Sequence, residues 1–320
     1  MIEKLMERMM KKKKIESMTK KMASEMMITI ELATKKYQVN ISKPMSLAIT
    51  VEFMSNKSTS NDDAVSQPNH FSASFAASKP MQVGDFIGDT QQGGSCNVNE
   101  LTINPHCNGT HTETIAHICD FNHELSTTIA DINLAPLIPC LLVSIKPIAA
   151  SDSIDSYTPA LVKGDRLITC AALESLLENY SNEQLQALVI RTLPNNKDKC
   201  AQAYNQNNQP PFFSREAILY LNERSVEHLL VDIPSLDRLH DDGLLTCHHL
   251  FWQVEEGQHQ ANKRNLVNKT ITEMVFIDNH ISDGYYFLNL QMPAFISDAA
   301  PSRPVLYSCT ILATEPSYET

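Results

Sequence analysis

Short apolar runs rich in β-branched residues begin at Met27 and set the pattern for the rest of the chain. The runs at 28–32, 37–41 and 47–51 have the length and composition of β-strands, so strands are expected there. The next stretch, Ser55 to Pro80, is rich in Ser, Asn and Asp and shows no period. It predicts a long surface loop that could fold over a site.

The second half of the chain alternates between continuous apolar runs and helical patterns. Such alternation is typical of an α/β protein with an at least partly parallel sheet, and neither an internal repeat nor an interdomain linker is evident. A single α/β domain is therefore predicted. The expected strands are 137–145, 187–192 and 228–233, and the expected helices are 171–180 and a second one that Ser214 caps and that runs through Leu221.

Composition narrows the class of protein. With 320 residues and 42% hydrophobic content the chain can bury a full core. The net charge of −11 argues against nucleic acid or an anionic membrane surface as a partner, because phosphate binding depends on Lys and Arg. No apolar stretch is long enough to span a bilayer. The eight cysteines are scattered without a Cys-x-x-Cys pair, which is typical of reduced thiols in a cytoplasmic protein.

The first residues differ in charge from the rest. Residues 1–22 carry eight basic and three acidic side chains, a net of +5, which leaves −16 on the remainder. No apolar core follows Lys14, so a secretory signal is not supported. We predict a disordered basic leader over 1–26 and a folded domain over 27–320, with a start at Met22, Met26 or Met27 as one explanation. A basic helix that docks on an acidic partner is the alternative.

Three histidines and a carboxylate lie within the twelve residues 106–117. On an extended segment, residues two apart project to the same side, so His111 and Glu113 can reach one ion together, while Gly109 lets the backbone bend and bring His106 toward it. If 114–119 is helical, His117 returns to the side that carries Glu113.

This spacing predicts a metal site. Neutral imidazole and carboxylate oxygen bind divalent ions such as zinc or manganese, and hydrolytic sites leave one position open for water. The alternative is a polar turn whose histidines have no common function. A single short segment rarely completes a site, so a second group of ligands is expected elsewhere in the chain.

Later motifs provide a candidate for that second group. They are Asp232-Ile233-Pro234-Ser235-Leu236-Asp237, the pair His248-His249, and Glu273 at an apolar run. Together with Gly109-Thr110-His111 and the early Ser42-Lys43-Pro44-Met45, they resemble, in the same order, the cyclase family of metal-dependent hydrolases, which includes kynurenine formamidases and isatin hydrolases. The resemblance extends from about Ile28 to Tyr307.

The resemblance implies a fold of the swivelling β/β/α type, a homo-oligomer (dimer or tetramer) and a bound divalent metal, Zn²⁺ or Mn²⁺, as one or two ions. It implies that His117 is the acid/base and that Glu113 can bridge two ions. His249 is an alternative to His248, because adjacent histidines leave the register open by one residue. The implied metal ligands are His106, His111, Glu113, His248 and Glu273.

Four features depart from the family pattern. Two residues rather than one separate the first histidine from Gly109, Glu113 stands where aspartate is usual, a proline is missing near Ala116, and the interval from His248 to Glu273 is long. Glutamate reaches one methylene further than aspartate, so Glu113 can compensate for the extra residue before Gly109.

The function these features favour is hydrolysis of an amide or cyclic amide C–N bond by metal-activated water, with arylformamidase, an activity of tryptophan catabolism, as the nearest family activity. A catalytically inactive metal-binding protein and a protein-interaction module that uses the leader and the 55–80 loop are the alternatives. Several further residues have either a site role or a purely structural one: Asp232, Ser235, Cys107, Phe251, Trp252 and Arg303.

Overall fold

The computed structural model describes residues 25–55, 67–121 and 127–312. Its internal contacts divide the chain into two units, 1–45 with 306–320, and 46–305. In the first unit, β1 (Met27–Leu32) pairs antiparallel with β2 (Lys35–Asn40), and β2 pairs antiparallel with β21 (Val305–Leu312). The strands predicted at 28–32 and 37–41 are therefore confirmed within two residues at each end. Most of the leader predicted over 1–26 lies outside the described residues.

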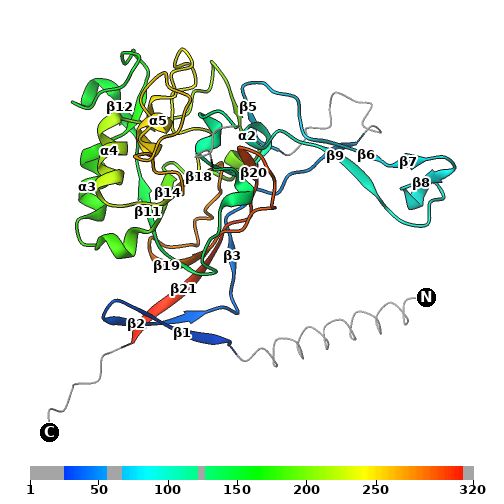
Figure 1. The fold of residues 1–320 in the computed structure, drawn as a ribbon, viewed down its shortest axis with the longest axis horizontal. Coiled ribbons are helices and arrows are strands. Elements are labelled where there is room, and N and C mark those ends of the chain that lie inside the picture. The colour runs from blue at the N-terminus through cyan, green and yellow to red at the C-terminus, as the bar shows by residue number, and fades with distance from the viewer. Residues whose placement is uncertain (1–24, 56–66, 122–126, 313–320) are drawn as a thin grey trace, which may run out of the picture. The chain divides into compact units, whose positions relative to one another are not determined.

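A mixed sheet forms the centre of the second unit (Figure 1). Its middle strands β11, β14, β17 and β18 are parallel, whereas β19 and β10 pair antiparallel at the two sides and β20 pairs antiparallel with β10. The strand order is β19 (Gly284–Asn289), β11 (Ile138–Ile145), β14 (Ala187–Thr192), β17 (His228–Val231), β18 (Thr270–Glu273), β10 (His111–Glu113) and β20 (Ala299–Pro301).

The core lies between this sheet and three helices. Every residue of β14 and β17 is buried, as expected of parallel strands whose sequence is almost continuously apolar. Helix α4 contacts both α3 and α5 (Figure 1). Ser214 caps α4 as predicted, since its hydroxyl accepts a hydrogen bond from the Ala217 amide. The helices are α3 (Cys170–Leu177), α4 (Arg215–Glu223) and α5 (Thr246–Trp252). The predicted α/β class with a partly parallel sheet is confirmed.

Shorter elements surround the sheet. An arm made of β6, β7, β8 and β9 projects from the unit (Figure 1). The bounds of the short elements are β3 (Met45–Ser46), β4 (Met54–Ser55), β5 (Asn69–His70), β6 (Ala77–Pro80), β7 (Gln82–Val83), β8 (Phe86–Ile87), β9 (Asn99–Thr102), α2 (Pro105–Asn108), β12 (Ile148–Ala149), β13 (Arg166–Ile168), β15 (Ala203–Tyr204) and β16 (Phe212–Phe213). None of the described helices is both long and apolar enough to cross a bilayer.

Two predictions for residues 47–80 differ from the structure. The strand expected at 47–51 is reduced to one bridge between Ala48 and Val275. The loop expected at 55–80 is wrong in its described part, because 67–80 contains β5 and β6 and its polar residues Gln67, Asn69 and His70 are buried. The burial of Gln67 is compensated, since its amide nitrogen donates to two backbone carbonyls and its oxygen accepts from the Ala76 amide. Polar composition therefore did not indicate exposure here.

Candidate metal centre

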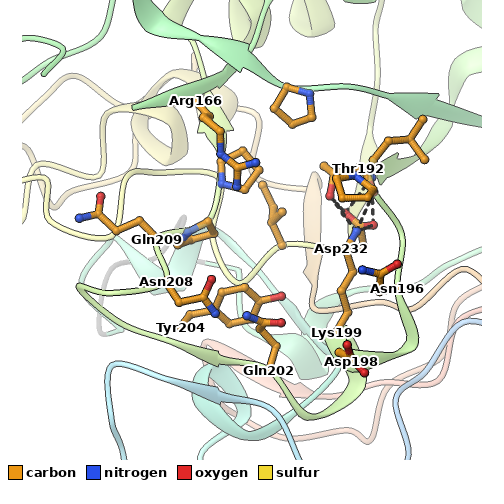
Figure 2. A pocket seen from close by; sticks show the side chains of 16 residues that line it. Arg166, Thr192, Asn196, Asp198, Lys199, Gln202, Tyr204, Asn208, Gln209 and Asp232 are labelled. Carbon is orange, nitrogen blue, oxygen red and sulfur yellow. Dashed lines mark hydrogen bonds and ion pairs between the residues drawn. The ribbon is translucent and has the colours of Figure 1, made fainter. Parts of the chain in front are cut away.

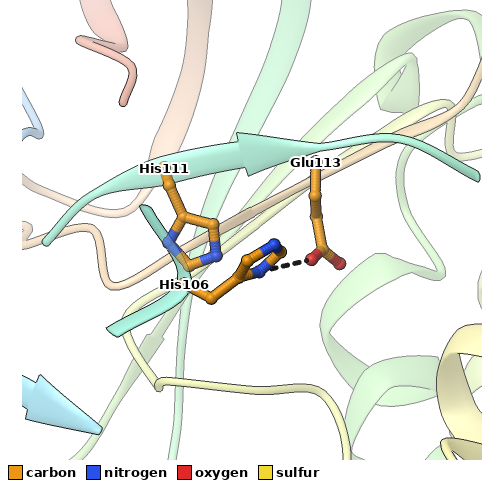
Figure 3. A group of neighbouring side chains, drawn as sticks. All are labelled: His106, His111 and Glu113. Atoms are coloured by element: carbon orange, nitrogen blue, oxygen red, sulfur yellow. Dashed lines mark ion pairs between the residues drawn. The ribbon is translucent and has the colours of Figure 1, made fainter. Parts of the chain in front are cut away.

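The segment 105–113 brings one histidine back toward the next. Pro105 begins α2, and the Asn104 side chain caps it by accepting a hydrogen bond from the His106 amide. Gly109 then passes so close to Val51 that an added Cβ would lie 2.7 Å from a Val51 methyl. This tight passage positions His106 so that its Nδ1 lies 3.3 Å from Oε2 of Glu113 (Figure 3).

Strand β10 presents His111 and Glu113 on one side, as the spacing of two predicted. Both side chains are fully buried. In the register of the two strands His111 is paired with Glu273 of β18, and Nε2 of His111 lies 3.4 Å from Oε2 of Glu273. The antiparallel pairing of β10 with β18 thus brings the two predicted carboxylates and His111 together.

Helix α5 contributes His248. Its Nε2 lies 2.9 Å from Oε1 of Glu113 and 3.6 Å from Oε1 of Glu273. His249 points elsewhere, with Nδ1 3.3 Å from the Val254 carbonyl oxygen. Of the two adjacent histidines, His248 is therefore the one that faces the carboxylates.

Hydrogen bonds on the opposite ring nitrogen orient His111 and His248. Nδ1 of His248 lies 2.5 Å from Oδ2 of Asp237, and Nδ1 of His111 lies 3.0 Å from the Gly109 carbonyl oxygen. Both rings thereby direct Nε2 at the carboxylates, which is the arrangement usual for metal-binding histidines. Asp237 belongs to the motif 232–237, and its carboxylate also accepts from the Tyr157 hydroxyl and the Cys247 amide.

The facing atoms lack hydrogen-bond partners of acceptable geometry. These buried atoms are Nε2 of His111, Nε2 of His248, and both carboxylate oxygens of Glu113. An unsatisfied buried polar atom costs about 1–3 kcal/mol, and more when it is charged, so four of them in one place would be expensive without a ligand. A divalent cation uses the lone pairs of imidazole nitrogen and carboxylate oxygen, so the donor set fits zinc or manganese.

The ligand atoms are close enough together to share ions. Those of His106, His111 and Glu113 all lie within 4.8 Å of one another, and so do those of Glu113, His117 and His248. Glu113 belongs to both groups, with Oε1 near His248 and Oε2 near His106. This arrangement suits a carboxylate that bridges two ions.

His117 lies at the open side of the cluster. The segment after Thr114 forms a single 3-10 turn, Ile115–His117, which is shorter than the helix considered for 114–119. Nε2 of His117 nevertheless lies 3.8 Å from Oε2 of Glu113, and the side chain is 24% exposed. Its partial exposure gives this imidazole access to solvent, which the buried His111 and His248 lack.

Asp298 completes the cluster and was not predicted. Its Oδ2 lies 2.8 Å from Nε2 of His106 and 3.4 Å from Nδ1 of His117, so one carboxylate contacts both histidines. Residue 298 immediately precedes β20, the strand that pairs with β10. Nothing in its sequence surroundings marks it, because its closeness to His106 results from strand pairing alone.

The charges in the cluster shift one another's pKa values. Burial alone would lower the pKa of His106, but Asp298 and Glu113 outweigh it and raise that pKa to about 10. Burial opposes the charged form of His248 too, and Glu113 and Asp237 raise its pKa well above the usual value. Conversely, the nearby His117 and His248 hold the pKa of Glu113 low despite its burial. The buried carboxylates thus require positive charge beside them, whether from protons on histidine or from a cation.

The other candidates contribute no ligand atom to this cluster, although the ring of Trp252 lies 5.8 Å from the ring of His248, centroid to centroid. Asp232 lines a cavity of about 200 Å³ (Figure 2). There its carboxylate lies 2.7 Å from Nζ of Lys199 and accepts a hydrogen bond from the Thr192 amide. Trp252 and Phe251 are fully buried core residues of α5, and Arg303 is exposed. Cys107 is buried within α2, and burial raises the pKa of its thiol, which does not favour a nucleophile. Ser235 accepts a hydrogen bond from the Asp237 amide, a role in the turn.

Known proteins resemble this chain over most of its length. A family model described as "Putative cyclase" matches residues 26–238. A kynurenine formamidase of Bacillus cereus is 27% identical over 249 residues, which cover 76% of this chain and 95% of that protein. A kynurenine formamidase of Bacillus anthracis is 26% identical over 252 residues, with the same coverage of both chains.

A solved structure supports the fold assignment. The structure of a predicted metal-dependent hydrolase from Bacillus stearothermophilus has a TM-score of 0.51 and 14% sequence identity. The similarity covers 83% of this chain and 98% of that one. At this level of identity the likeness shows a shared fold.

Proposed function

Since this chain belongs to the cyclase family, as the match over residues 26–238 shows, we propose that it is a metal-dependent hydrolase of an amide C–N bond, with an aryl formamide as substrate. The observation that carries the proposal is the convergence of Nε2 of His248, Nε2 of His111 and the carboxylates of Glu113 and Glu273 in one buried cluster. The kynurenine formamidases that the chain resembles support the choice of substrate class.

We assign the binding of the metal to five residues: His106, His111, Glu113, His248 and Glu273. A divalent ion held there would polarise the substrate carbonyl and lower the pKa of bound water toward about 7. Zn²⁺ is the ion we propose first, with Mn²⁺ as the other ion that this donor set accommodates. The two oxygens of Glu113 face different histidines, which favours two ions over one.

His117 is proposed to move protons. Its side chain is partly exposed, as that of His106 is, whereas His111 and His248 are buried. Asp298 contacts Nδ1 of His117. A contact on Nδ1 leaves Nε2 on the side of Glu113, where it can accept a proton during attack and deliver one to the leaving amine. General acid–base transfer of this kind contributes about a hundred- to ten-thousandfold in rate.

The state of the cysteines supports a proposal for the cellular location. All eight lie in the described part of the chain and none forms a disulfide, including the buried Cys107, Cys119, Cys140 and Cys247. Thiols that are not cross-linked are usual in reducing compartments. A cytoplasmic location is therefore proposed. The homo-oligomer implied by the family resemblance stays a prediction.

The experiment that tests the function combines metal content with turnover. Purified full-length protein is analysed for zinc and manganese, and hydrolysis of N-formylkynurenine and of formanilide is measured before and after treatment with a chelator. The proposal expects bound metal, release of formate, and loss of activity with the chelator that added metal restores. Full activity of metal-free protein would refute it. Stoichiometric metal without turnover on any amide would favour the inactive metal-binding alternative.

A further inference from the structure

His70 is a buried histidine whose ring nitrogens have no protein partner among the described residues. The residue is 3% exposed, and neither Nδ1 nor Nε2 makes a hydrogen bond. Leaving buried polar groups unsatisfied destabilises the folded chain. An apolar ring would be more stable at such a core position. The histidine is therefore better explained if its ring nitrogens bind a ligand.

The neighbours of His70 place it beside the metal centre. Its strand β5 contacts α2, the helix that carries His106, and β5 and α2 lie near each other in Figure 1. The charge of a protonated His70 would interact favourably with Glu273 and unfavourably with His111, His106 and His240. The first three belong to the candidate ligand set, so the ring of His70 lies close enough to the cluster to respond to its charges.

The backbone around His70 is held in place. On its other side β5 pairs with β15, where His70 is opposite Tyr204. The Asn69 amide donates to the Gln202 carbonyl, and the Asn69 side chain donates to the Ala73 carbonyl. These bonds fix the strand but use no atom of the His70 ring, so the ring is positioned and still available.

The ring is uncharged at neutral pH. Burial is the main cause that lowers the pKa of His70 to about 4. A neutral imidazole offers one N–H donor and one acceptor nitrogen. An amide substrate carries both complementary groups, a carbonyl oxygen and an N–H, whereas a second imidazolium would add positive charge beside a cation.

We propose that His70 is a substrate-positioning residue of the metal centre, whose ring nitrogens hydrogen-bond the amide group of the bound substrate. This inference rests on the proposed function. It assigns recognition of the substrate amide to His70, a residue outside the set of metal ligands. It also explains why an apolar ring does not occupy this buried position, since the unsatisfied nitrogens of the free protein gain a partner when substrate binds.

The test compares three variants of the zinc-loaded full-length protein. His70→Phe keeps an aromatic ring and removes both nitrogens, and His70→Gln restores a donor and an acceptor. His228→Phe is the matched control, because His228 is also buried and neutral but its Nδ1 bonds Thr270 within the sheet. Each protein is titrated with benzamide by calorimetry, and its Tm, zinc content, and KM and kcat for formanilide are measured.

For His70→Phe we expect full zinc content, an unchanged or higher Tm, and benzamide affinity and KM weakened about tenfold or more, as loss of one or two hydrogen bonds implies. His70→Gln should recover part of the affinity. His228→Phe should lower Tm and leave benzamide affinity unchanged.

Three outcomes would overturn the role of His70. They are equal benzamide affinity in His70→Phe and the unmodified protein, no detectable benzamide binding by the unmodified protein, and loss of zinc in His70→Phe, which would make His70 a ligand. A protein that binds benzamide in a His70-dependent manner and hydrolyses no amide would refute only the hydrolase proposal.

Discussion

Oε1 of Glu113, on strand β10, lies 2.9 Å from Nε2 of His248, on helix α5. The two residues are far apart in sequence, and both are buried. Their contact joins the early histidine run to the later His and Glu residues in one cluster. A ligand set of this kind requires the pairing of β10 with β18 and the placement of α5, so it exists only in the folded chain.

The Glu113 carboxylate should be essential for metal binding. Glu113→Gln keeps the size of the side chain and removes its charge, so we expect loss of bound metal and of all turnover. Glu113→Asp shortens the reach by one methylene, so we expect metal content and activity to fall in part. Elemental analysis and the formanilide assay measure both. Full metal content and activity in Glu113→Asp would refute the idea that the longer carboxylate compensates for the extra residue before Gly109.

Asp237 should act through His248 and not through substrate. Asp237→Asn replaces the anionic oxygen that Nδ1 of His248 contacts at 2.5 Å, so the orientation and basicity of the ring suffer. Loss of such an outer partner typically weakens metal affinity about 10- to 100-fold. Competition with a chromogenic zinc chelator measures the change.

Tyr157→Phe is the matched control for Asp237→Asn. It removes the hydroxyl that donates to Oδ1 of Asp237 and leaves the contact between Oδ2 and His248. We expect at most a small loss of zinc affinity in this variant. An equally large loss in both variants would mean that the carboxylate supports the local fold and does not specifically orient His248.

Substitutions of His117 and His111 should have different effects on catalysis and on metal binding. His117→Ala should keep metal and lose about a hundred- to ten-thousandfold in kcat, since only proton transfer is removed. His111→Ala should lose metal and activity together, because Nε2 of His111 faces Glu273 at 3.4 Å inside the buried cluster. Metal analysis and steady-state kinetics on the same preparations distinguish the two. Retention of normal kcat by His117→Ala would contradict its assignment.

His106 should make the stability of the metal-free protein depend on pH. Its pKa rises from 6.5 to about 10 in the folded chain, so the folded state binds more protons than the unfolded state between these values. The stabilisation is complete below pH 6.5 and is lost as the pH rises toward 10. As a metal ligand His106 would bind as neutral imidazole, so the Tm gain from added zinc should grow over this range.

Scanning calorimetry over the pH range between these two pKa values, with and without zinc, checks this dependence. The control is metal-free His106→Gln, which should have a flatter decline of Tm with pH. An identical decline in His106→Gln and the unmodified protein would show that other groups cause it.

Local spacing was enough to predict part of the site. The interval of two between His111 and Glu113 places both side chains on one side of any strand, and β10 has this geometry. The apolar run at 187–192 likewise needs no partner to indicate a buried strand, and β14 coincides with it. Features set by a few neighbouring residues are therefore visible in sequence. The inclusion of His248 and Glu273 came from the family resemblance.

Features that depend on distant pairing were not visible. Asp298 reaches His106 only because β20 pairs with β10. His70 lies in a segment whose polar composition predicted an exposed loop, although pairing of β5 with β15 buries it. The strand expected at 47–51 fails for the opposite reason, because its β-branched residues find only one bridging partner, between Ala48 and Val275. Composition indicates only the local tendency to form a strand or a loop. Whether a segment joins the sheet depends on its pairing with distant segments.

The central claim is that ligands from both parts of the chain bind one centre, and anomalous X-ray scattering at the zinc edge tests it most directly. Crystals of zinc-loaded protein should show an anomalous peak about 2.0–2.2 Å from Nε2 of His248 and from an oxygen of Glu113, with a second peak on the side of His106 if two ions bind. An anomalous map without a peak among His111, Glu113, His248 and Glu273, or with zinc bound only elsewhere, would contradict the account.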